Sequence, residues 1–232
     1  MLASLLPSAV AAVEVRALPA DATLFPEEAA CVRDAVAKRR SEFTAVRWCA
    51  RVAMGRLGLR PAPVVPGVRG APGWPPSVTG SMTHCAGYHA AALTRLSDHS
   101  SLGIDAEPDQ PLPEGILDVI ALGPERRQID ALLRTRPGLA WDRLLFSVKE
   151  SVFKTWYPLT GRELDFDEAL ITLDPALGAF HAELLARPEL PGDAYAPREF
   201  TGRWARDGGV LVSAIAHTAD APAPARLARL GA

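Results

Sequence analysis

A helical pattern over residues 141–157 constrains the fold more than any other feature, because it is apolar on two opposite faces. At about 100° per residue, one stripe is entirely aliphatic or aromatic and contains Trp141, Leu144, Leu145, Val148, Val152 and Trp156. The second stripe mixes aromatic, polar and charged side chains and contains Arg143, Phe146, Ser147, Glu150, Phe153, Lys154 and Tyr157. A helix that is apolar on opposite faces is buried on both, so we expect neighbours on each side of it.

The size and composition of the chain are those of a globular protein with a sizeable core. It has 232 residues, of which 48% are hydrophobic and 22% are charged, so disorder is not expected. This length suits one large domain or two lobes of about 110 residues each. The formal net charge of -2 gives no support for nucleic acid as a partner.

Cysteine usage and hydropathy indicate a cytoplasmic protein. Cys31, Cys49 and Cys85 are odd in number and form no C-x-x-C pair, which argues against a disulfide framework or structural zinc and suits a reducing compartment. No apolar run is long enough to span a bilayer, so no membrane partner is expected. Residues 1–18 are apolar but lack a basic segment and contain Pro7, so we interpret them as a strand or an arm rather than a signal peptide.

Short elements separated by proline and glycine surround the long helix. The Pro26-Glu-Glu segment opens a helix that runs to about residue 59 with a break near Ala37, since proline and acids both suit a first helical turn. Residues 61–78 are rich in proline and glycine and predict a loop, and Asp207-Gly-Gly predicts a hairpin. Strands are expected at 8–19, 78–83, 90–94, 102–105, 168–173, 178–185, 199–206 and 210–217, with helices at 116–120 and 124–134.

These elements predict an α+β fold of two similar lobes, each a small, mostly antiparallel sheet packed with helices. The prolines between 108 and 113 mark the boundary, which gives an N-terminal lobe of residues 1–108 and a C-terminal lobe of residues 109–232. The tail at 221–232 is expected to be loose. A duplicated lobe would suit a monomer, and an active site is expected where the lobes meet.

A pair of carboxylates follows one predicted strand. Asp105 and Glu107 are two residues apart, so a strand places both on one face, and Pro108 ends the strand directly after them. Two converging acids repel each other unless a cation or a proton intervenes. Oxygen ligands without nearby histidine or cysteine suit Mg²⁺ or Mn²⁺, and Glu150 is the candidate for a third carboxylate. An isolated D-x-E pattern is nevertheless frequent by chance and can be a solvated strand end.

Charged side chains on the long helix have an alternative explanation. Glu150 and Lys154 could form an ordinary i,i+4 pair on the surface, and taken alone this is the commoner case. If the helix is buried on both sides, however, Glu150 is a semi-buried carboxylate that needs a partner. Lys149 and Lys154 would then face phosphate groups beside the metal.

Two further segments suit a phosphate-containing ligand. In the helix after residue 37, Arg40, Arg47 and Arg51 share one face and Arg39 is adjacent, although a basic face alone is more often simply solvated. Thr83 and His84 follow a glycine-serine turn. A hydroxyl and an imidazole there can bind a phosphate, although a histidine beside apolar residues is more often structural.

Taken in order, these motifs resemble the 4'-phosphopantetheinyl transferases, specifically the two-lobed surfactin-synthetase-activating type of actinobacteria. The segments that carry the resemblance cover most of residues 38–170 and are KRRSEFTAVRWCAR, GAPGWP, GSMTHCAGY, GIDAEP, WDRLLF, FSVKESVFKTWYP and LDFDEALI. The GIDAE segment and the KE-x4-K helix together are highly specific.

The resemblance implies a pseudo-twofold fold with coenzyme A bound between the lobes. It implies transfer of the phosphopantetheine arm to a serine of an apo acyl or peptidyl carrier protein, with release of adenosine 3',5'-bisphosphate. Mg²⁺, or Mn²⁺ in its place, would sit on the pyrophosphate. By the matched motifs, its ligands would be Asp105, Glu107, Glu150 and the carbonyl of Ala106.

The resemblance also implies roles for the remaining candidates. Glu150, Asp105 and Lys154 would be catalytic, with Glu150 removing the proton of the carrier serine. The coenzyme A phosphates would be bound by Arg39, Arg47, Thr83, His84, Lys149 and Lys154. Many relatives carry a G-K-P turn where this chain has Gly70-Ala71-Pro72, and Arg69 is the candidate to supply the missing charge.

Two other classes of protein compete with this interpretation. A non-catalytic module that binds coenzyme A or carrier proteins would not need three acids and two lysines, all of which are present. A Mg²⁺-dependent phosphohydrolase or nuclease could use D-x-E and a distant glutamate, but a nuclease favours a more basic surface.

Overall fold

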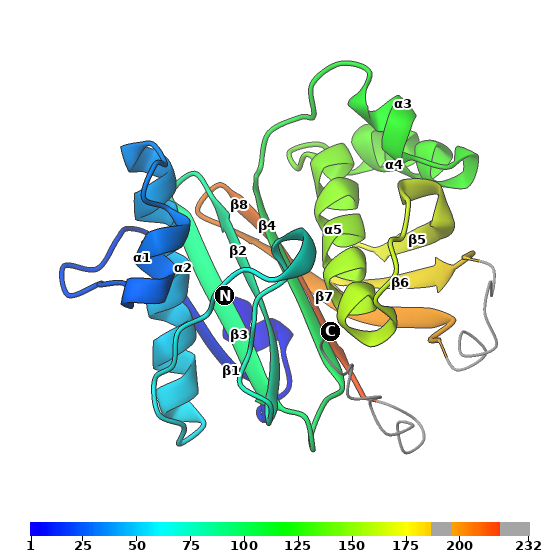
Figure 1. The fold of residues 1–232 in the computed structure, drawn as a ribbon. Coiled ribbons are helices and arrows are strands. Elements are labelled where there is room, and N and C mark those ends of the chain that lie inside the picture. Colours follow the sequence, from blue (N-terminus) through cyan, green and yellow to red (C-terminus); the bar gives the residue numbers. More distant parts are fainter. Residues whose placement is uncertain (187–195, 219–232) are drawn as a thin grey trace.

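The computed structural model describes residues 1–186 and 196–218, which form two antiparallel sheets packed with helices (Figure 1). The first sheet has the strand order β1-β3-β2 and contains β1 (Ala11–Val15), β2 (Val78–Cys85) and β3 (Tyr88–Arg95). The second has the order β4-β8-β7-β6-β5 and contains β4 (Ser101–Pro108), β5 (Ala169–Asp174), β6 (Ala179–Leu184), β7 (Glu199–Asp207) and β8 (Val210–His217). The predicted α+β class is confirmed. The predicted loose tail lies outside the described residues.

The helices of the N-terminal half are η1 (Leu2–Leu5), α1 (Pro26–Cys31), α2 (Ala37–Arg56) and the short η2 (Val68–Gly70). Helix α2 covers one face of the first sheet, whereas η1 packs between the two sheets with β1, β7 and β8. The predicted break near Ala37 is confirmed, since α1 ends at Cys31 and α2 begins at Ala37. Helix α2 packs on β1 and β3 through a cluster that includes Cys49, Ala53 and Met54. Helix α2 also contacts β2, an edge strand of the first sheet.

The C-terminal half is organised around the long helix. Its helices are α3 (Ile116–Ile120), α4 (Gly123–Thr135), α5 (Trp141–Thr160) and η3 (Phe166–Glu168). All six members of the predicted apolar stripe of α5 are buried, so that prediction is confirmed. Helix α5 lies against β4 and β8, and it approaches β4 closely at Gly103, where an added Cβ would overlap the carbonyl oxygen of Ser151. The predicted hairpin joins β7 and β8, and Gly208 and Gly209 there have φ values of 55° and 75°.

The two sheets share a hydrophobic cluster. From the first half it contains Leu2, Leu5, Val10, Ala12, Tyr88, Ala90 and Ala92, and from the second half Leu102, Ile104, Ala106, Val210, Val212 and Ala214. Strand β4 pairs with β8 along its whole length, so residues 101–108 hydrogen-bond within the second sheet. The lobe boundary after residue 108 stays a prediction, but this strand belongs to the same sheet as the elements that follow it.

Candidate active site

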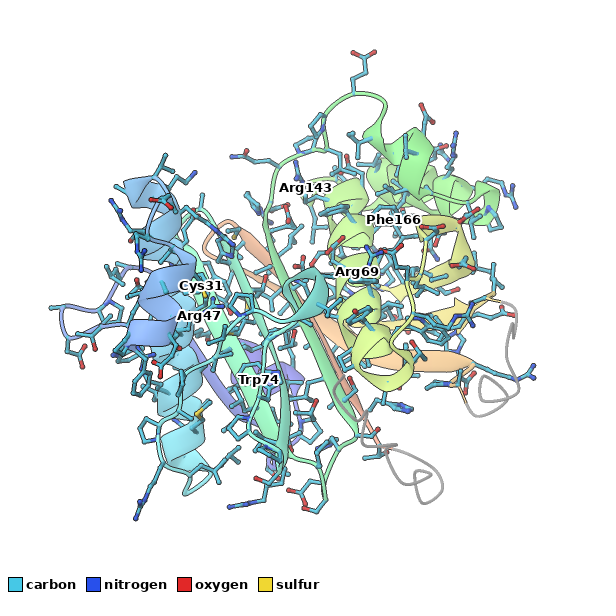
Figure 2. All side chains as sticks on the ribbon, in the orientation of Figure 1. Cys31, Arg47, Arg69, Trp74, Arg143 and Phe166 are labelled. Carbon is cyan, nitrogen blue, oxygen red and sulfur yellow. The ribbon has the colours of Figure 1, made fainter. Side chains whose placement is uncertain are left out.

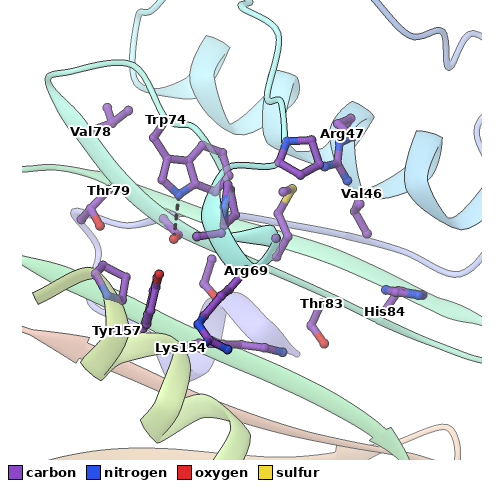
Figure 3. Close-up of a pocket in the computed structure, with 18 of the residues that line it drawn as sticks. Val46, Arg47, Arg69, Trp74, Val78, Thr79, Thr83, His84, Lys154 and Tyr157 are labelled. Atoms are coloured by element: carbon purple, nitrogen blue, oxygen red, sulfur yellow. Dashed lines mark hydrogen bonds between the residues drawn. The ribbon is translucent and has the colours of Figure 1, made fainter. Parts of the chain in front are cut away.

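A cavity of about 540 Å³ opens between α2, the loop before β2, strand β2 itself and the C-terminal half of α5 (Figure 3). Seven residues proposed from the sequence line it, namely Arg39, Arg47, Arg69, Thr83, His84, Glu150 and Lys154. They come from positions more than a hundred residues apart. The fold therefore brings basic, hydroxyl and carboxylate groups of both halves to one cavity.

Asp105 is the central acid beside this cavity. It lies on β4 with only 4% of its surface exposed. Its Oδ1 accepts hydrogen bonds from Lys154 Nζ at 2.6 Å and from Thr83 Oγ1 at 3.2 Å. Its Oδ2 is buried and has no hydrogen-bond partner among the described residues. One oxygen of this carboxylate is thus held by both halves of the molecule, while the other makes no hydrogen bond within the described part of the chain.

Glu107 and Glu150 surround Asp105 with further negative charge. Glu107 Oε2 accepts a hydrogen bond from Arg143 Nη1 at 3.1 Å. Burial raises the pKa of Glu107, the charge of Asp105 raises it further, and Arg143 opposes the rise. Burial likewise raises the pKa of Glu150, while Lys154 lowers it and Asp105 raises it. The acids are close enough to disfavour one another's ionisation, which is the electrostatic setting of a cation site.

Metal ligation itself is not visible in the side-chain arrangement. Within residues 1–186 and 196–218, no group of three or more His, Cys, Asp and Glu side chains is arranged to hold a metal ion. Asp105 Oδ1 forms an ion pair with Lys154, and Glu107 Oε2 forms one with Arg143. Ala106 is buried between its neighbours, with its N–H donated to Thr83 Oγ1 at 3.1 Å. The predicted roles of these residues as metal ligands stay predictions.

Lys149 points toward α4 and β5 and does not line the cavity. Its ammonium forms an ion pair with Glu125 Oε2 at 2.9 Å and donates to the carbonyl oxygens of Phe166 and Ala169 at 2.6 and 2.8 Å. An ammonium has three N–H donors, and these three partners engage all of them. In this structure Lys149 therefore ties α5 to α4 and β5, and its predicted role at the pyrophosphate stays a prediction.

The basic end of the cavity is built from α2. Arg47 is almost buried, lies over the ring of Phe43 at 3.3 Å from its centroid, and donates to the carbonyl oxygen of Val64. Burial lowers the pKa of Arg47 to about 10, so it remains charged at neutral pH. Figure 2 shows this residue on the α2 side of the cavity and Arg69 on the loop facing α5. Arg47 can therefore present a fixed positive charge to an anionic ligand.

His84 belongs to a small polar cluster at the same end. Its Nε2 lies 3.4 Å from Arg39 Nη1 and 3.5 Å from Glu42 Oε2. Burial lowers the pKa of His84, and Glu42 only partly opposes this shift. The lowered pKa favours the neutral imidazole, which can contact a phosphate through a hydrogen bond. The sequence interpretation gave Glu42 no role.

The other arginines on α2 do not form one basic face. Arg51 Nη1 forms a buried ion pair with Glu28 Oε2 at 2.9 Å, and Glu28 Oε1 accepts the N–H of Val64 at 2.8 Å. Arg40 donates to the carbonyl oxygen of Arg33. Of the α2 arginines at issue, Arg39 and Arg47 line the cavity.

Arg69 lies at the rim of the cavity in an unusual backbone conformation. Its φ is 55°, in the left-handed region, and its guanidinium pairs with Glu163. Both side chains of this pair are more than half exposed, so the pair is screened by solvent. Arg69 therefore lines the cavity, and its predicted role in binding a ligand stays a prediction.

Apolar side chains that had no assigned role complete the cavity. Trp74 donates its Nε1 proton to the carbonyl oxygen of Gly80 at 2.9 Å, as Figure 3 shows, and so packs the loop onto β2. Phe153 and Tyr157 form a ring pair on α5 with centroids 5.8 Å apart. Both belong to the mixed stripe of the long helix, which was the available signal, whereas the proline-rich sequence around Trp74 gives no comparable periodicity.

Comparison with known protein families agrees with this geometry. A model of the 4'-phosphopantetheinyl transferase N-terminal domain matches residues 27–94, and the 4'-phosphopantetheinyl transferase superfamily model matches residues 101–192. The chain belongs to the 4'-phosphopantetheinyl transferase superfamily, whose members use coenzyme A to modify carrier proteins. The family predicted from the sequence motifs is confirmed.

Individual relatives match over most of the chain. The 4'-phosphopantetheinyl transferase Svp of Streptomyces mobaraensis is 55% identical over 227 residues, covering 95% of this chain and 91% of Svp. The 4'-phosphopantetheinyl transferase PptT of Mycobacterium tuberculosis is 42% identical over 223 residues, covering 93% and 97%. Enterobactin synthase component D of Salmonella typhi is 33% identical over 203 residues, covering 83% and 80%.

Proposed function

We propose that this protein transfers the 4'-phosphopantetheine arm of coenzyme A to a serine of apo acyl or peptidyl carrier proteins in a Mg²⁺-dependent reaction. The observation that carries the proposal is that Glu150 and Lys154, the partner of Asp105, line the same cavity as Arg39 and Arg47. Coenzyme A has a pyrophosphate and a 3'-phosphate, and this cavity offers several positive side chains to them. Mn²⁺ would satisfy the same oxygen ligands.

The donor set fits a hard divalent cation. Asp105 Oδ2 is buried without a hydrogen-bond partner among the described residues, and such an atom needs compensation. Burial raises the pKa of both Glu107 and Glu150, and the charge of Asp105 raises each of them further. Asp105, Glu107 and Glu150 would hold the ion, with the Ala106 carbonyl as a further ligand. When bound, Mg²⁺ would neutralise charge on the pyrophosphate.

The residues of the chain supply the other requirements of the reaction. A bond forms between the carrier serine oxygen and the β-phosphorus, and the bond from that phosphorus to the leaving adenosine 3',5'-bisphosphate breaks. Glu150 accepts the serine proton, and its raised pKa makes it a better base at neutral pH. Lys154 stabilises the developing charge on the phosphates, while Arg39, Arg47 and Arg69 hold the nucleotide end.

The wider setting is also part of the proposal. All three cysteines are free, which supports a reducing cytoplasm. No helix in the described part of the chain could span a membrane. We propose that the protein acts as a monomer, with carrier proteins and coenzyme A as its partners.

Intact-mass spectrometry of a purified apo carrier protein tests the function. Incubation with this protein, coenzyme A and Mg²⁺ should add one phosphopantetheine group, about 340 Da, and EDTA should prevent the addition. The Asp105→Ala variant should also lose it. No mass gain across several acyl and peptidyl carriers, with coenzyme A still bound, would instead identify a non-catalytic binding module. Release of phosphate without any carrier would identify a hydrolase.

A further inference from the structure

The two sheets are joined at their boundary by hydroxyl groups of β2 that accept backbone hydrogen bonds from β4. Ser81 Oγ accepts the N–H of Ile104 at 3.1 Å, and Thr83 Oγ1 accepts the N–H of Ala106 at 3.1 Å. Both hydroxyl-bearing residues are about 95% buried. Alternate side chains of one strand thus bond alternate peptide groups of the other.

Thr83 differs from Ser81 because it makes an additional hydrogen bond to Asp105. Its hydroxyl also lies 3.2 Å from Asp105 Oδ1, to which it donates its proton. A threonine hydroxyl has a single proton and two lone pairs. With the proton given to Asp105 and one lone pair given to the Ala106 N–H, the hydroxyl can offer only a lone pair to the cavity. A phosphate oxygen is itself an acceptor, so Thr83 in this arrangement is a poor phosphate ligand.

The two donors on Asp105 select which of its oxygens is free. Thr83 reaches Oδ1 from the first sheet, and Lys154 reaches the same oxygen from α5 at 2.6 Å. The torsion that exchanges the two oxygens of an aspartate is broad, so nothing intrinsic to the side chain fixes it. Two donors that reach the same oxygen from different directions do fix the torsion of the Asp105 carboxylate. Oδ2 is then the oxygen that stays buried without a partner in the described structure.

We propose that Thr83 is a positioning residue that orients Asp105 from the opposite sheet and so presents Oδ2 to the divalent cation. This inference rests on the proposed function, because it assumes that the cation binds at Asp105. It differs from a role of Thr83 as a direct ligand of the coenzyme A phosphates. Partners that orient a metal-binding side chain typically contribute about 10- to 100-fold to metal affinity.

Matched variants separate these two roles. Thr83→Val keeps the shape of the side chain but removes the proton, Thr83→Ser retains it, and Thr83→Ala is the second variant if valine prevents folding. Ser81→Ala is the control, since it removes the same kind of bond to β4 without touching Asp105. Two dissociation constants are measured by calorimetry: that of coenzyme A in EDTA, and that of Mn²⁺ with coenzyme A saturating.

We expect Thr83→Val and Thr83→Ala to weaken Mn²⁺ binding by about tenfold or more, and Thr83→Ser to restore it. Coenzyme A affinity in EDTA should stay within about twofold in all variants. Ser81→Ala should lower the thermal midpoint like Thr83→Val but leave Mn²⁺ binding unchanged.

Unchanged Mn²⁺ binding in Thr83→Val overturns the proposal, and weaker coenzyme A binding in EDTA at the same time would assign Thr83 to phosphate. An equal loss of Mn²⁺ affinity in Ser81→Ala also overturns the proposal. The loss would then come from weaker packing between β2 and β4 in general and not from the orientation of Asp105. Both constants are measured without a carrier protein. Failure of the wild-type protein to modify any carrier would therefore count against the proposed function and leave the result on Thr83 standing.

Discussion

Lys149 and Glu125 form a buried ion pair in which Nζ and Oε2 are 2.9 Å apart, while the next residue, Glu150, lines the cavity. The side chains of Lys149 and Glu125 are 2% and 0% exposed. Glu125 also accepts the backbone N–H groups of Leu122 and Ile171. Lys149 thus holds α5 against the C-terminal half, while the neighbouring Glu150 faces the cavity.

The Lys149→Met variant should lose stability rather than coenzyme A affinity. Removing one partner of a buried ion pair leaves the other charged and uncompensated, which costs about 3–5 kcal/mol. Urea denaturation should show this loss, whereas the exposed Lys38→Met control should change stability by less than about 0.5 kcal/mol. A large loss of coenzyme A affinity with nearly unchanged stability would return Lys149 to the phosphate site.

Gly103→Ala should separate α5 from β4. A Cβ at this position would overlap the Ser151 carbonyl oxygen and the Thr155 hydroxyl. Because the Ser151 carbonyl belongs to the backbone of α5, it cannot move without moving the helix, and we expect a loss of about 3 kcal/mol in the free energy of unfolding. Ligand binding should weaken as well, since Lys154 lies on the displaced helix. The control is Gly55→Ala, where nothing lies within 4 Å. It sits inside α2 and should gain about 1 kcal/mol in denaturant unfolding. Similar losses in both variants would contradict the close approach.

Glu150→Gln should reduce transfer far more than coenzyme A binding. A glutamine cannot accept the serine proton, and loss of a general base typically costs about 10²–10⁴-fold in rate. Mass spectrometry of the carrier gives the rate, and calorimetry in EDTA gives the coenzyme A affinity, which should change by less than about threefold. An equal loss in both measurements would make Glu150 a ligand only.

The same substitution should change how stability depends on pH. The folded protein raises the pKa of Glu150 above its ordinary value of 4.5, so the native state holds this proton over a pH range in which the unfolded state has lost it. Stability contributed by Glu150 is therefore lost as pH rises from 4.5 through the folded pKa. In EDTA, Glu150→Gln should match the wild type below this range and be more stable above it. Parallel curves at all pH values would contradict the raised pKa.

Variants of Arg69 and Glu163 test whether Arg69 supplies the positive charge that many relatives carry as the lysine of a G-K-P turn. Arg69→Ala should weaken coenzyme A binding by about tenfold, since a charge-assisted contact is worth about 1.5–3 kcal/mol. Glu163→Gln should leave stability within about 1 kcal/mol, because the pair is exposed. It should not weaken coenzyme A binding, because it frees the guanidinium. If both variants bind coenzyme A equally poorly, the pair serves to hold the loop.

Periodicity and turn chemistry predicted most elements of this fold. The long helix was located to within three residues, because its two apolar stripes are unambiguous, and it extends to Thr160. Lys149 does not line the cavity, and a signal for this was present: Lys154 is five residues further on, which is about 140° around a helix, so the two lysines project from different faces of α5. The identity of the partner, Glu125, could not be predicted, because it depends on how α4 packs.

The pairing of β4 with β8 could not be predicted from the sequence. An alternating pattern shows that residues 101–108 form a strand, but it does not show which neighbour it bonds. The prolines after Pro108 suggested a boundary there, whereas β4 pairs with β8 from a distant part of the chain. Motif resemblance predicted a group of three carboxylates, whose role as metal ligands stays a prediction. The hydrogen bonds from Arg143 to Glu107 and from Thr83 to Asp105 depend on strand pairing and could not be predicted.

The cluster shared by the two sheets has a consequence for how the chain could be divided. Every strand of the first sheet precedes Leu96 and every described strand of the second begins at Ser101 or later, so one exposed turn around Ser97 is the covalent link between complete sheets. Each fragment of a chain cut at Ser97 would nevertheless carry half of a common core with an open apolar face. Such fragments would depend on each other to fold, and reassembly of the cavity would report their association.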